Sequence, residues 1–244
     1  MLEKKIRINS YDVYPNSIMK PSALMRHMQQ IAREDCDGMG ATYDYMRSLN
    51  TVFVLTKLAI EFVRPVKDGE ELTLKTYNNT ITGIIFDREY ELVSDSGVAA
   101  RATTLWTLVR YDTRSLVRPS SFPVPFETVN LDIKPIDMPR RIGAEGIKTV
   151  GTHTVRTSEL DENNHLNNCI YADIALDSVK DFDGLGSWPK SIKLIFRHEA
   201  RRGDELEISA SFEDGVHRVF AKNLNGGAAC FETEIRLAGA PDGE

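Results

Sequence analysis

The chain has 244 residues, 41% of them hydrophobic, and a formal net charge of −6 at pH 7. This length is enough to bury a sizeable core, organised as two tightly joined subdomains rather than two free ones. The negative charge argues against generic nucleic-acid binding, and no apolar run approaches the roughly 20 residues that span a bilayer.

Cysteine and glycine usage narrows the chemistry further. The three cysteines have no C-x-x-C spacing, and the five histidines show no metal-ligand spacing with them. Unpaired cysteines are typical of a reducing compartment, and residues 1–6 contain no signal-peptide core, so we expect a cytoplasmic protein. Walker and dinucleotide-binding glycine motifs are missing from the sequence, and we expect no cofactor.

The first half of the chain predicts one long helix followed by strands. Apolar residues recur at helical spacing over residues 22–36. Residues 60–72 are typical of a strand, a turn with acidic and glycine signals, and another strand. Further strands are predicted over 83–93 and 100–110. The helix stripe is interpreted as core, and it consists of Leu24, Met25, Met28, Ile31 and Ala32.

A proline-rich segment separates the two halves. Its prolines, with scattered charges between them, predict an ordered linker that wraps the surface. We therefore predict an N-terminal domain over 1–120, a linker over 121–150 and a C-terminal domain over 151–244. The last six residues are expected to fray. The prolines are Pro119, Pro123, Pro125, Pro135 and Pro139.

The most polar stretch runs from Asp161 to Asn168 and contains two carboxylates, four amides and one imidazole. Such groups bury badly unless every one is paired, so the stretch favours the wall of a reaction pocket over a core strand. Apolar residues at helical spacing follow it, which predicts a helix over 168–179 with Asn167 or Asn168 as its N-cap. The start of that helix supplies free backbone N–H donors.

The chain also repeats itself, because segment 194–206 matches segment 60–72 without a gap. Each matched pair is 134 positions apart: Phe62 and Phe196, Gly69 and Gly203, Leu72 and Leu206. Strands are predicted to follow over 216–224 and 228–237, as they do in the first half. The sequence therefore predicts an α+β architecture made twice, in which each half packs a long helix on a curved antiparallel sheet.

The two copies differ in their ionisable residues. Arg64 and Pro65 occupy the places of His198 and Glu199, and no histidine precedes the first helix. Chemistry present in one copy only indicates a division of labour. We expect the second half to react, and the first half to shape a pocket or hold a ligand.

These motifs resemble a known family, the acyl-ACP thioesterases of plant plastids and their bacterial relatives. A signature of that family is similar to Asp161-x-Asn163-x-His165-Leu166-Asn167-Asn168-x-x-Tyr171, and its second motif is similar to Phe196-Arg197-His198-Glu199-Ala200. Trp106 and the turn Thr113-Arg114 resemble a family strand and the turn that follows it. The likeness covers roughly residues 4–238 and implies a tandem (double) hotdog fold.

The resemblance implies an enzyme that hydrolyses fatty acyl-[acyl carrier protein] to free fatty acid. It implies the catalytic residues Asp161, Asn163, His165 and Glu199. Ala200 stands where the family often has cysteine, so a thiolate mechanism is hard to sustain and water is the expected nucleophile. We favour Glu199 as the general base and Asp161 as the residue that fixes the network, with the reverse assignment and an acyl-anhydride intermediate left open.

The resemblance also implies where the substrate binds. We expect an apolar tunnel lined from the first half by Leu24, Met25, Met28, Phe53, Leu55 and Trp106. The carrier protein is the expected partner, and its acidic surface and phosphate would be attracted to Arg197, Arg201 and Arg202. The sequence leaves homodimer formation and acyl chain length undetermined.

Other functions on the same scaffold remain open. An acyl-CoA thioesterase would accept the same pantetheine thioester. A non-catalytic acyl-binding hotdog protein would have no need to keep Asp161, Asn163, His165 and Glu199 together. A dehydratase-type hotdog enzyme uses a histidine and an acidic residue in a different arrangement.

Overall fold

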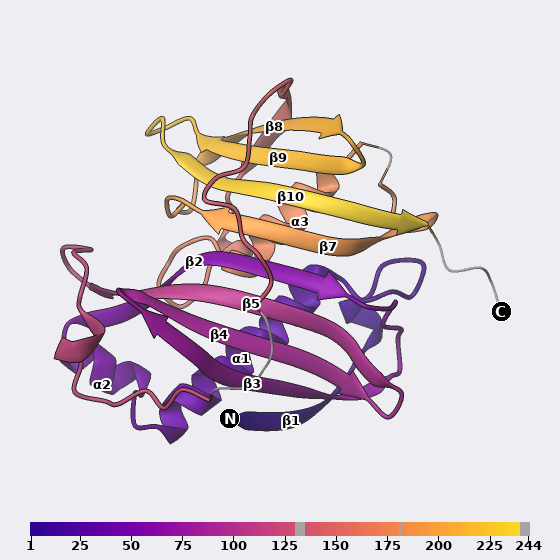
Figure 1. Cartoon of the computed structure of the whole chain (residues 1–244). Helices are drawn as coiled ribbons and strands as arrows, with labels where there is room; N and C mark the ends of the chain where they lie inside the picture. The colour runs from indigo at the N-terminus through magenta and orange to yellow at the C-terminus, as the bar shows by residue number, and fades with distance from the viewer. Residues whose placement is uncertain (130–134, 181, 240–244) are drawn as a thin grey trace.

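The fold is one continuous antiparallel sheet with its helices gathered on one face. The computed structural model describes residues 1–129, 135–180 and 182–239. In these residues ten strands are ordered β1-β3-β4-β5-β2-β7-β10-β9-β8-β6. Figure 1 shows α1 and α3 behind this sheet, α1 across the first five strands and α3 across the rest. The predicted α+β architecture is confirmed.

The elements of the first half end at Arg110. They are β1 (Leu2–Arg7), α1 (Pro21–Gly38), α2 (Tyr43–Ser48), β2 (Thr51–Phe62), β3 (Glu71–Thr82), β4 (Ile85–Ser94) and β5 (Gly97–Arg110). The predicted helix over 22–36 is α1, and the predicted strands over 83–93 and 100–110 are β4 and β5. The strand β1, the helix α2 and the first part of β2 were not predicted.

The elements of the second half begin at Lys148. They are β6 (Lys148–Thr154), α3 (Asn168–Asp177), β7 (Ser187–Phe196), β8 (Glu205–Glu213), β9 (Val216–Asn223) and β10 (Ala229–Gly239). The predicted helix over 168–179 is α3, two residues shorter. The edge strand β6 was not expected, and it starts three residues before the predicted domain boundary.

The repeat found in the sequence is also a repeat in backbone geometry. Gly69 and Gly203 occupy the same turn with φ of 82° and 83°, values that glycine adopts without strain. The amide of Gly69 donates to Ile8 O, and the amide of Gly203 donates to Val155 O, both at 2.9 Å. The glycine of the β2–β3 connection and that of the β7–β8 connection therefore make the same contact in both halves.

The loop before each long helix is duplicated too, with a different offset. Val13 pairs with Met19 and Leu160 pairs with Leu166 in matching isolated bridges, 147 positions apart. Each loop then contains one residue at positive φ, Ser17 at 61° and Asn164 at 62°. The polar loop of the second half is thus a structural copy of residues 13–19. In that alignment Ile18 stands in the place of His165.

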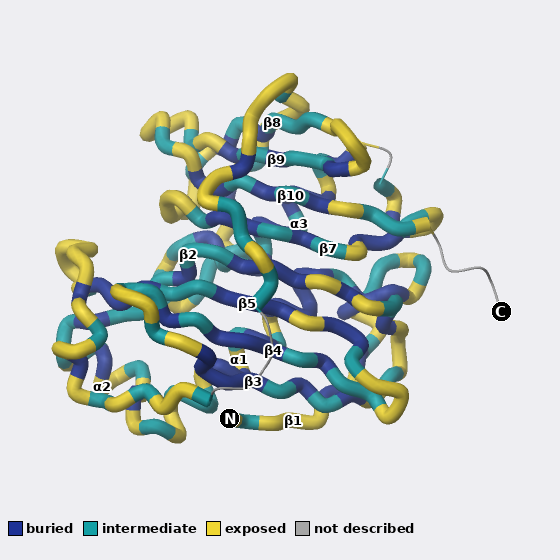
Figure 2. The backbone as a smooth tube through the Cα atoms, viewed as in Figure 1, coloured by how far each residue is buried: buried dark blue, intermediate teal, exposed yellow. Residues whose placement is uncertain are grey.

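The halves are joined through the central strands β2 and β7. Leu58 faces Leu194 and Ile60 faces Ile192 across this antiparallel pair, and all four side chains are buried. Figure 2 shows buried backbone running through β4, β5, β2 and β7. One hydrophobic core therefore extends through both halves.

The linker crosses the face of the sheet opposite the helices (Figure 1). Lys57 Nζ donates to Pro139 O at 2.7 Å, and the Ile142 amide donates to Glu232 Oε2 at 2.8 Å. The predicted linker includes residues 130–134, and the predicted fraying tail includes residues 240–244; both lie outside the described residues. Within the described ranges, no helix is long and apolar enough to cross a membrane.

Candidate active site

A cavity of about 610 Å³ lies between the two halves of the fold. Its walls come from α1, α2, the inner face of β2, β4 and β5, the polar loop 161–168 and the segment that follows β7. This volume is typical of a small-molecule site. Asp161, Asn163, His165 and Glu199, predicted from two distant segments, all line this one cavity.

Asp161 holds the polar loop in shape. Its Oδ1 accepts the backbone amides of Asn163 at 2.9 Å and His165 at 3.1 Å. Its own amide donates to His165 O at 2.8 Å. The carboxylate therefore closes a tight turn, in which Asn164 takes positive φ, and presents its neighbours to the cavity.

The end of the loop is fixed by the helix that it feeds. Asn167 is the N-cap of α3, and its Oδ1 accepts the Cys169 amide at 3.0 Å. The Leu166 amide donates to Ala200 O at 2.8 Å, which ties the loop to the segment that carries Glu199. His165 and Glu199 are thus neighbours through backbone bonds as well as side chains.

The side chains of His165 and Glu199 are in direct contact, and a third residue extends this network. His165 Nε2 lies 3.1 Å from Glu199 Oε2. On the other side, Arg114 Nη2 lies 2.8 Å from Oε1 and 3.1 Å from Oε2 of the same carboxylate. The His165 side chain is 13% exposed and that of Glu199 is 37% exposed. Arg114 follows β5, so this network joins the two halves.

Asn163 is oriented by a residue of the first half. Tyr43, at the start of α2, donates its hydroxyl to Asn163 Oδ1 at 3.2 Å. The guanidinium of Arg33 lies 5.2 Å from the centre of the Tyr43 ring, and its Nη1 contacts Glu162 at 2.5 Å. With Oδ1 occupied by a donor, the two N–H groups of the Asn163 amide remain for a further acceptor.

Sequence reasoning missed Tyr43 and Arg114 as site residues. Tyr43 lies in a short helix that had no periodic signal. Arg114 was noticed only as part of a turn, where it adopts φ of 57°. Both come from the half that carries no ionisable motif, so their role depends on the way the halves meet.

The cysteines offer no activated thiolate among the described residues. Cys169 is fully buried in α3, and burial raises the pKa of its thiol to about 12. Burial likewise raises the pKa of Cys230 to about 11 and raises that of Cys36. Of these three, Cys36 lines the cavity. A neutral thiol is a poor nucleophile.

The predicted acyl-binding residues fall into two groups. Phe53, Leu55 and Trp106 line the cavity. The others lie in the core, 1–2% exposed, and do not contribute to the walls of the large cavity; they are Leu24, Met25 and Met28. The reason is that the apolar face of α1 packs on the sheet, while its more polar side, with Arg26, Gln29 and Arg33, lines the cavity.

The three predicted carrier-binding arginines also differ in their surroundings. Arg197 lines the cavity, and its Nε donates to Glu232 Oε1 at 2.7 Å. Arg201 and Arg202 are exposed in the turn before Gly203, which connects β7 to β8, outside the cavity lining. In the described part of the chain, no group of three or more His, Cys, Asp and Glu side chains could hold a metal ion.

Solved structures with this architecture define the class of fold. An acyl-ACP thioesterase from Bacteroides thetaiotaomicron superposes with a TM-score of 0.88 at 20% identity, covering 97% of each chain. The 12:0-ACP thioesterase from Umbellularia californica gives a TM-score of 0.83 at 19% identity, covering 98% of this chain and 97% of that one. The predicted tandem hotdog fold is confirmed.

Sequence models then identify the family. The acyl-ACP thioesterase N-terminal domain matches residues 1–121, and the acyl-ACP thioesterase C-terminal domain matches residues 145–237. This chain belongs to the acyl-ACP thioesterase family.

Curated relatives are similar at low identity. Oleoyl-acyl carrier protein thioesterase 1 of Arabidopsis thaliana, a chloroplastic protein, is 23% identical over 231 residues, which cover 84% of this chain and 62% of that protein. Dodecanoyl-[acyl-carrier-protein] hydrolase of Cinnamomum camphora is 25% identical over 232 residues, which cover 88% of this chain and 60% of that protein. The chain thus spans about three fifths of the length of these two relatives.

Proposed function

We propose that this protein hydrolyses the thioester of fatty acyl-[acyl carrier protein] and releases free fatty acid. The observation that carries the proposal is the meeting of Asn163, His165 and Glu199 on the wall of one cavity, to which the sheet contributes apolar side chains such as Phe53, Leu55 and Trp106. Membership of the acyl-ACP thioesterase family supports the same substrate class.

The first requirement of the reaction is a polarised carbonyl. The Tyr43 hydroxyl donates to Asn163 Oδ1, so the NH₂ group of the Asn163 side chain is left to donate to the thioester oxygen. Negative charge develops on that oxygen as water attacks the carbonyl carbon, and a donor fixed in advance stabilises it most in the transition state. Asp161 supports this step indirectly by holding the loop.

The second requirement is an activated water. We assign the proton of the attacking water to the His165–Glu199 pair, which acts as one unit. The carbon–sulfur bond then breaks, and the same pair returns the proton to the departing thiolate. Arg114 holds the Glu199 carboxylate against His165, and Ala200 leaves no thiol at the neighbouring position.

The carrier protein is the proposed partner. Arg197 at the cavity and the exposed Arg201 and Arg202 supply positive charge beside Glu199, in a protein whose net charge is negative. Such charges attract the phosphate of a pantetheine arm. The free cysteines suit a reducing compartment, and we propose a cytoplasmic location.

The test measures thiol release from matched panels of acyl-ACP and acyl-CoA substrates. In His165→Ala and Glu199→Ala we expect kcat/KM to fall by about 10²–10⁴-fold, the usual contribution of general acid–base groups. The matched control is His153→Ala, because His153 Nε2 lies 3.0 Å from Glu159 in a similar pair outside the cavity. Fatty acid binding without any thiol release from the wild type would overturn the proposal in favour of an acyl-binding protein.

A further inference from the structure

The far end of the cavity contains a buried charge that the proposed reaction does not use. Arg88 projects from β4 into the space between the sheet and α1, and it is 4% exposed. It lines the same cavity as His165 and Glu199, together with Asn78 of β3 and Cys36 of α1. An acyl chain that enters at the reacting end would meet these groups with its tail.

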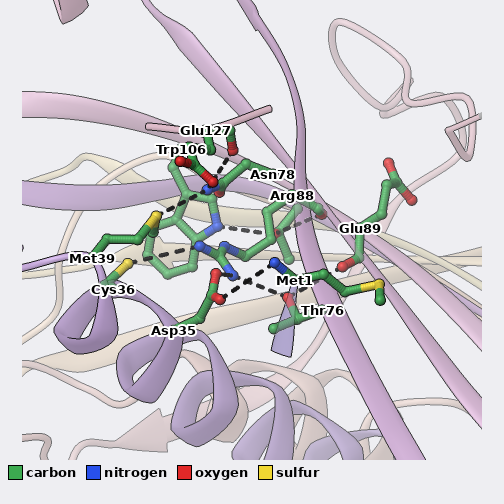
Figure 3. Close-up of polar contacts among 11 residues, drawn as sticks. Met1, Asp35, Cys36, Met39, Thr76, Asn78, Arg88, Glu89, Trp106 and Glu127 are labelled. Carbon is green, nitrogen blue, oxygen red and sulfur yellow. Dashed lines mark hydrogen bonds and ion pairs between the residues drawn. The ribbon is translucent and has the colours of Figure 1, made fainter. Parts of the chain in front are cut away.

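Arg88 is held in a polar cluster (Figure 3). Its Nη1 donates to Asp35 Oδ2 at 2.8 Å and to Thr76 Oγ1 at 3.1 Å, and its Nη2 contacts Cys36 Sγ at 3.7 Å. The Asp35 side chain is 10% exposed. A buried guanidinium with a carboxylate partner stays charged, and it has five N–H groups to satisfy.

The sheet topology separates this cluster from the reacting groups. Arg88 lies on β4, whereas Glu199 follows β7, and the order β4-β5-β2-β7 places three strand spacings, about 14 Å, between the two strands. Trp106 on β5 and Leu55 on β2 lie between them on the cavity wall, and Phe86 lines it beside Arg88 on β4. The cavity is therefore reactive at one end, apolar in the middle and charged at the other end.

We propose that the Arg88–Asp35 pair is a polar floor that sets the longest unsubstituted acyl chain that the protein accepts. This inference rests on the proposed thioesterase function and specifies its substrate class as chains that end before Arg88. A chain that reaches the floor must displace water from a charged pair and cannot replace its hydrogen bonds.

The floor limits the chain by desolvation and not by bulk alone. Each methylene buried against the apolar middle should raise affinity about fourfold. That gain should stop, and reverse, when a methyl end covers the guanidinium. A hydroxyl at the end of the chain can donate to Asp35 or accept from Arg88, so it should restore acceptance of a chain that is otherwise too long.

The variant that tests the floor is Arg88→Met combined with Asp35→Leu. Both residues are changed together because removal of one partner leaves an unpaired buried charge and destabilises the fold. The control is Arg64→Met with Glu70→Gln, which removes a first-half ion pair of 2.7 Å that does not line the cavity. Thermal unfolding of both variants shows whether they fold.

The substrates are acyl-ACPs of increasing saturated chain length, each with and without a terminal hydroxyl. For the wild type we expect kcat/KM to drop at least about tenfold once the chain exceeds a limiting length. A terminal hydroxyl on such a longer chain should restore kcat/KM. In the double variant kcat/KM should keep rising about fourfold per methylene, and the preference for the hydroxyl should disappear. The control variant should keep the wild-type profile.

Two results would overturn the inference. One is an unchanged length limit in a folded double variant. The other, which needs only the wild type, is a terminal hydroxyl that gives no recovery, because that would indicate a steric limit.

A binding measurement separates this inference from the proposed function. Calorimetric titration with free fatty acids and their terminal hydroxy acids reports the length limit without any turnover. If binding shows a length limit that the hydroxyl relieves but the protein releases no thiol, the thioesterase proposal would be contradicted and the polar floor would still be supported. Thiol release with a length limit that a terminal hydroxyl does not relieve, or with no limit at all, would support the thioesterase proposal and reject the polar floor.

Discussion

Two carboxylates of the site take different parts because their surroundings differ. Asp161 accepts two backbone amides within its own loop, so it maintains a conformation. The Glu199 carboxylate lies between two side chains, with His165 on one side and Arg114 on the other. The second arrangement suits proton transfer and the first does not. This supports the assignment of Glu199 to the water-activating pair over the reverse.

Arg114 is predicted to act as a positioning residue. Arg114→Ala should lower kcat by up to about 100-fold while KM changes little, because a displaced Glu199 no longer aligns His165. Arg114→Lys keeps the positive charge and should recover part of the loss. Steady-state kinetics on acyl-ACP measure both effects.

The control for this prediction is Arg118→Ala, an exposed arginine of the same segment after β5 that lies outside the cavity lining. Thermal unfolding should change little in any of these variants, because the Arg114 side chain is 38% exposed. If the unfolding temperature of Arg114→Ala also fell markedly, the loss of kcat would reflect a damaged fold, and Arg114 would be merely structural.

At the scale of elements, β4 carries ionisable side chains on both of its faces. Arg88 points to the cavity, while Asp87 and Glu89 point to the face that the linker covers. Thr103 Oγ1 donates to Glu89 Oε1 at 2.9 Å and to Oε2 at 2.8 Å, and it accepts the Ile136 amide at 2.9 Å. The Thr103 hydroxyl therefore connects the linker to the buried carboxyl group of Glu89 through hydrogen bonds.

This buried carboxyl predicts a pH dependence of stability. Burial, opposed by the Thr103 hydrogen bonds and reinforced by Asp87, raises the pKa of Glu89 from 4.5 to about 8. Between these values the folded protein keeps a proton that the unfolded chain has lost. The contribution of Glu89 is therefore fully present below about pH 4.5 and is lost as pH rises toward 8.

The measurement is urea unfolding of the wild type and Glu89→Gln from pH 5 to pH 9. Glutamine stays neutral, so the unfolding free energy of the variant should fall less than that of the wild type as pH rises toward 8. Above about pH 8 the two plots of unfolding free energy against pH should run parallel. Glu91→Gln, two residues along the same face, is the control. Equal pH slopes for the wild type and Glu89→Gln would contradict the raised pKa.

At the scale of the whole molecule, the site exists only where the halves meet. The second half supplies His165 and Glu199, and the first half supplies Tyr43, Arg114 and the apolar cavity wall. The β2–β7 pair holds these contributions in one sheet. This arrangement agrees with our proposal that one copy of the duplicated fold performs the chemistry and the other binds and orients the substrate.

The halves are therefore predicted to depend on each other. Residues 148–244 expressed alone should show neither cooperative unfolding nor thiol release, because the buried faces of β7 and α3 would lose their partners. Circular dichroism on heating and the thiol assay measure both properties, with the full chain as control. A cooperative, active 148–244 fragment would show that the first half is dispensable.

The sequence by itself determined the repeat, the two long helices and the loop that holds His165. These features are local: apolar periodicity defines α1, an amide before an apolar run marks the N-cap of α3, and the turn glycines Gly69 and Gly203 adopt positive φ. The edge strands β1 and β6 escaped prediction because their residues are mostly exposed and show no buried alternation.

The tertiary structure alone decided which distant residues share the cavity. Arg114 reaches Glu199 across 85 positions and Tyr43 reaches Asn163 across 120, contacts that depend on strand order and not on local pattern. The same cause kept Met28, which was also expected in the acyl tunnel, away from the walls of the large cavity and brought Arg88 to them. Periodicity predicts which face of a helix is buried, but only the packing of that helix on the sheet determines which side borders the cavity.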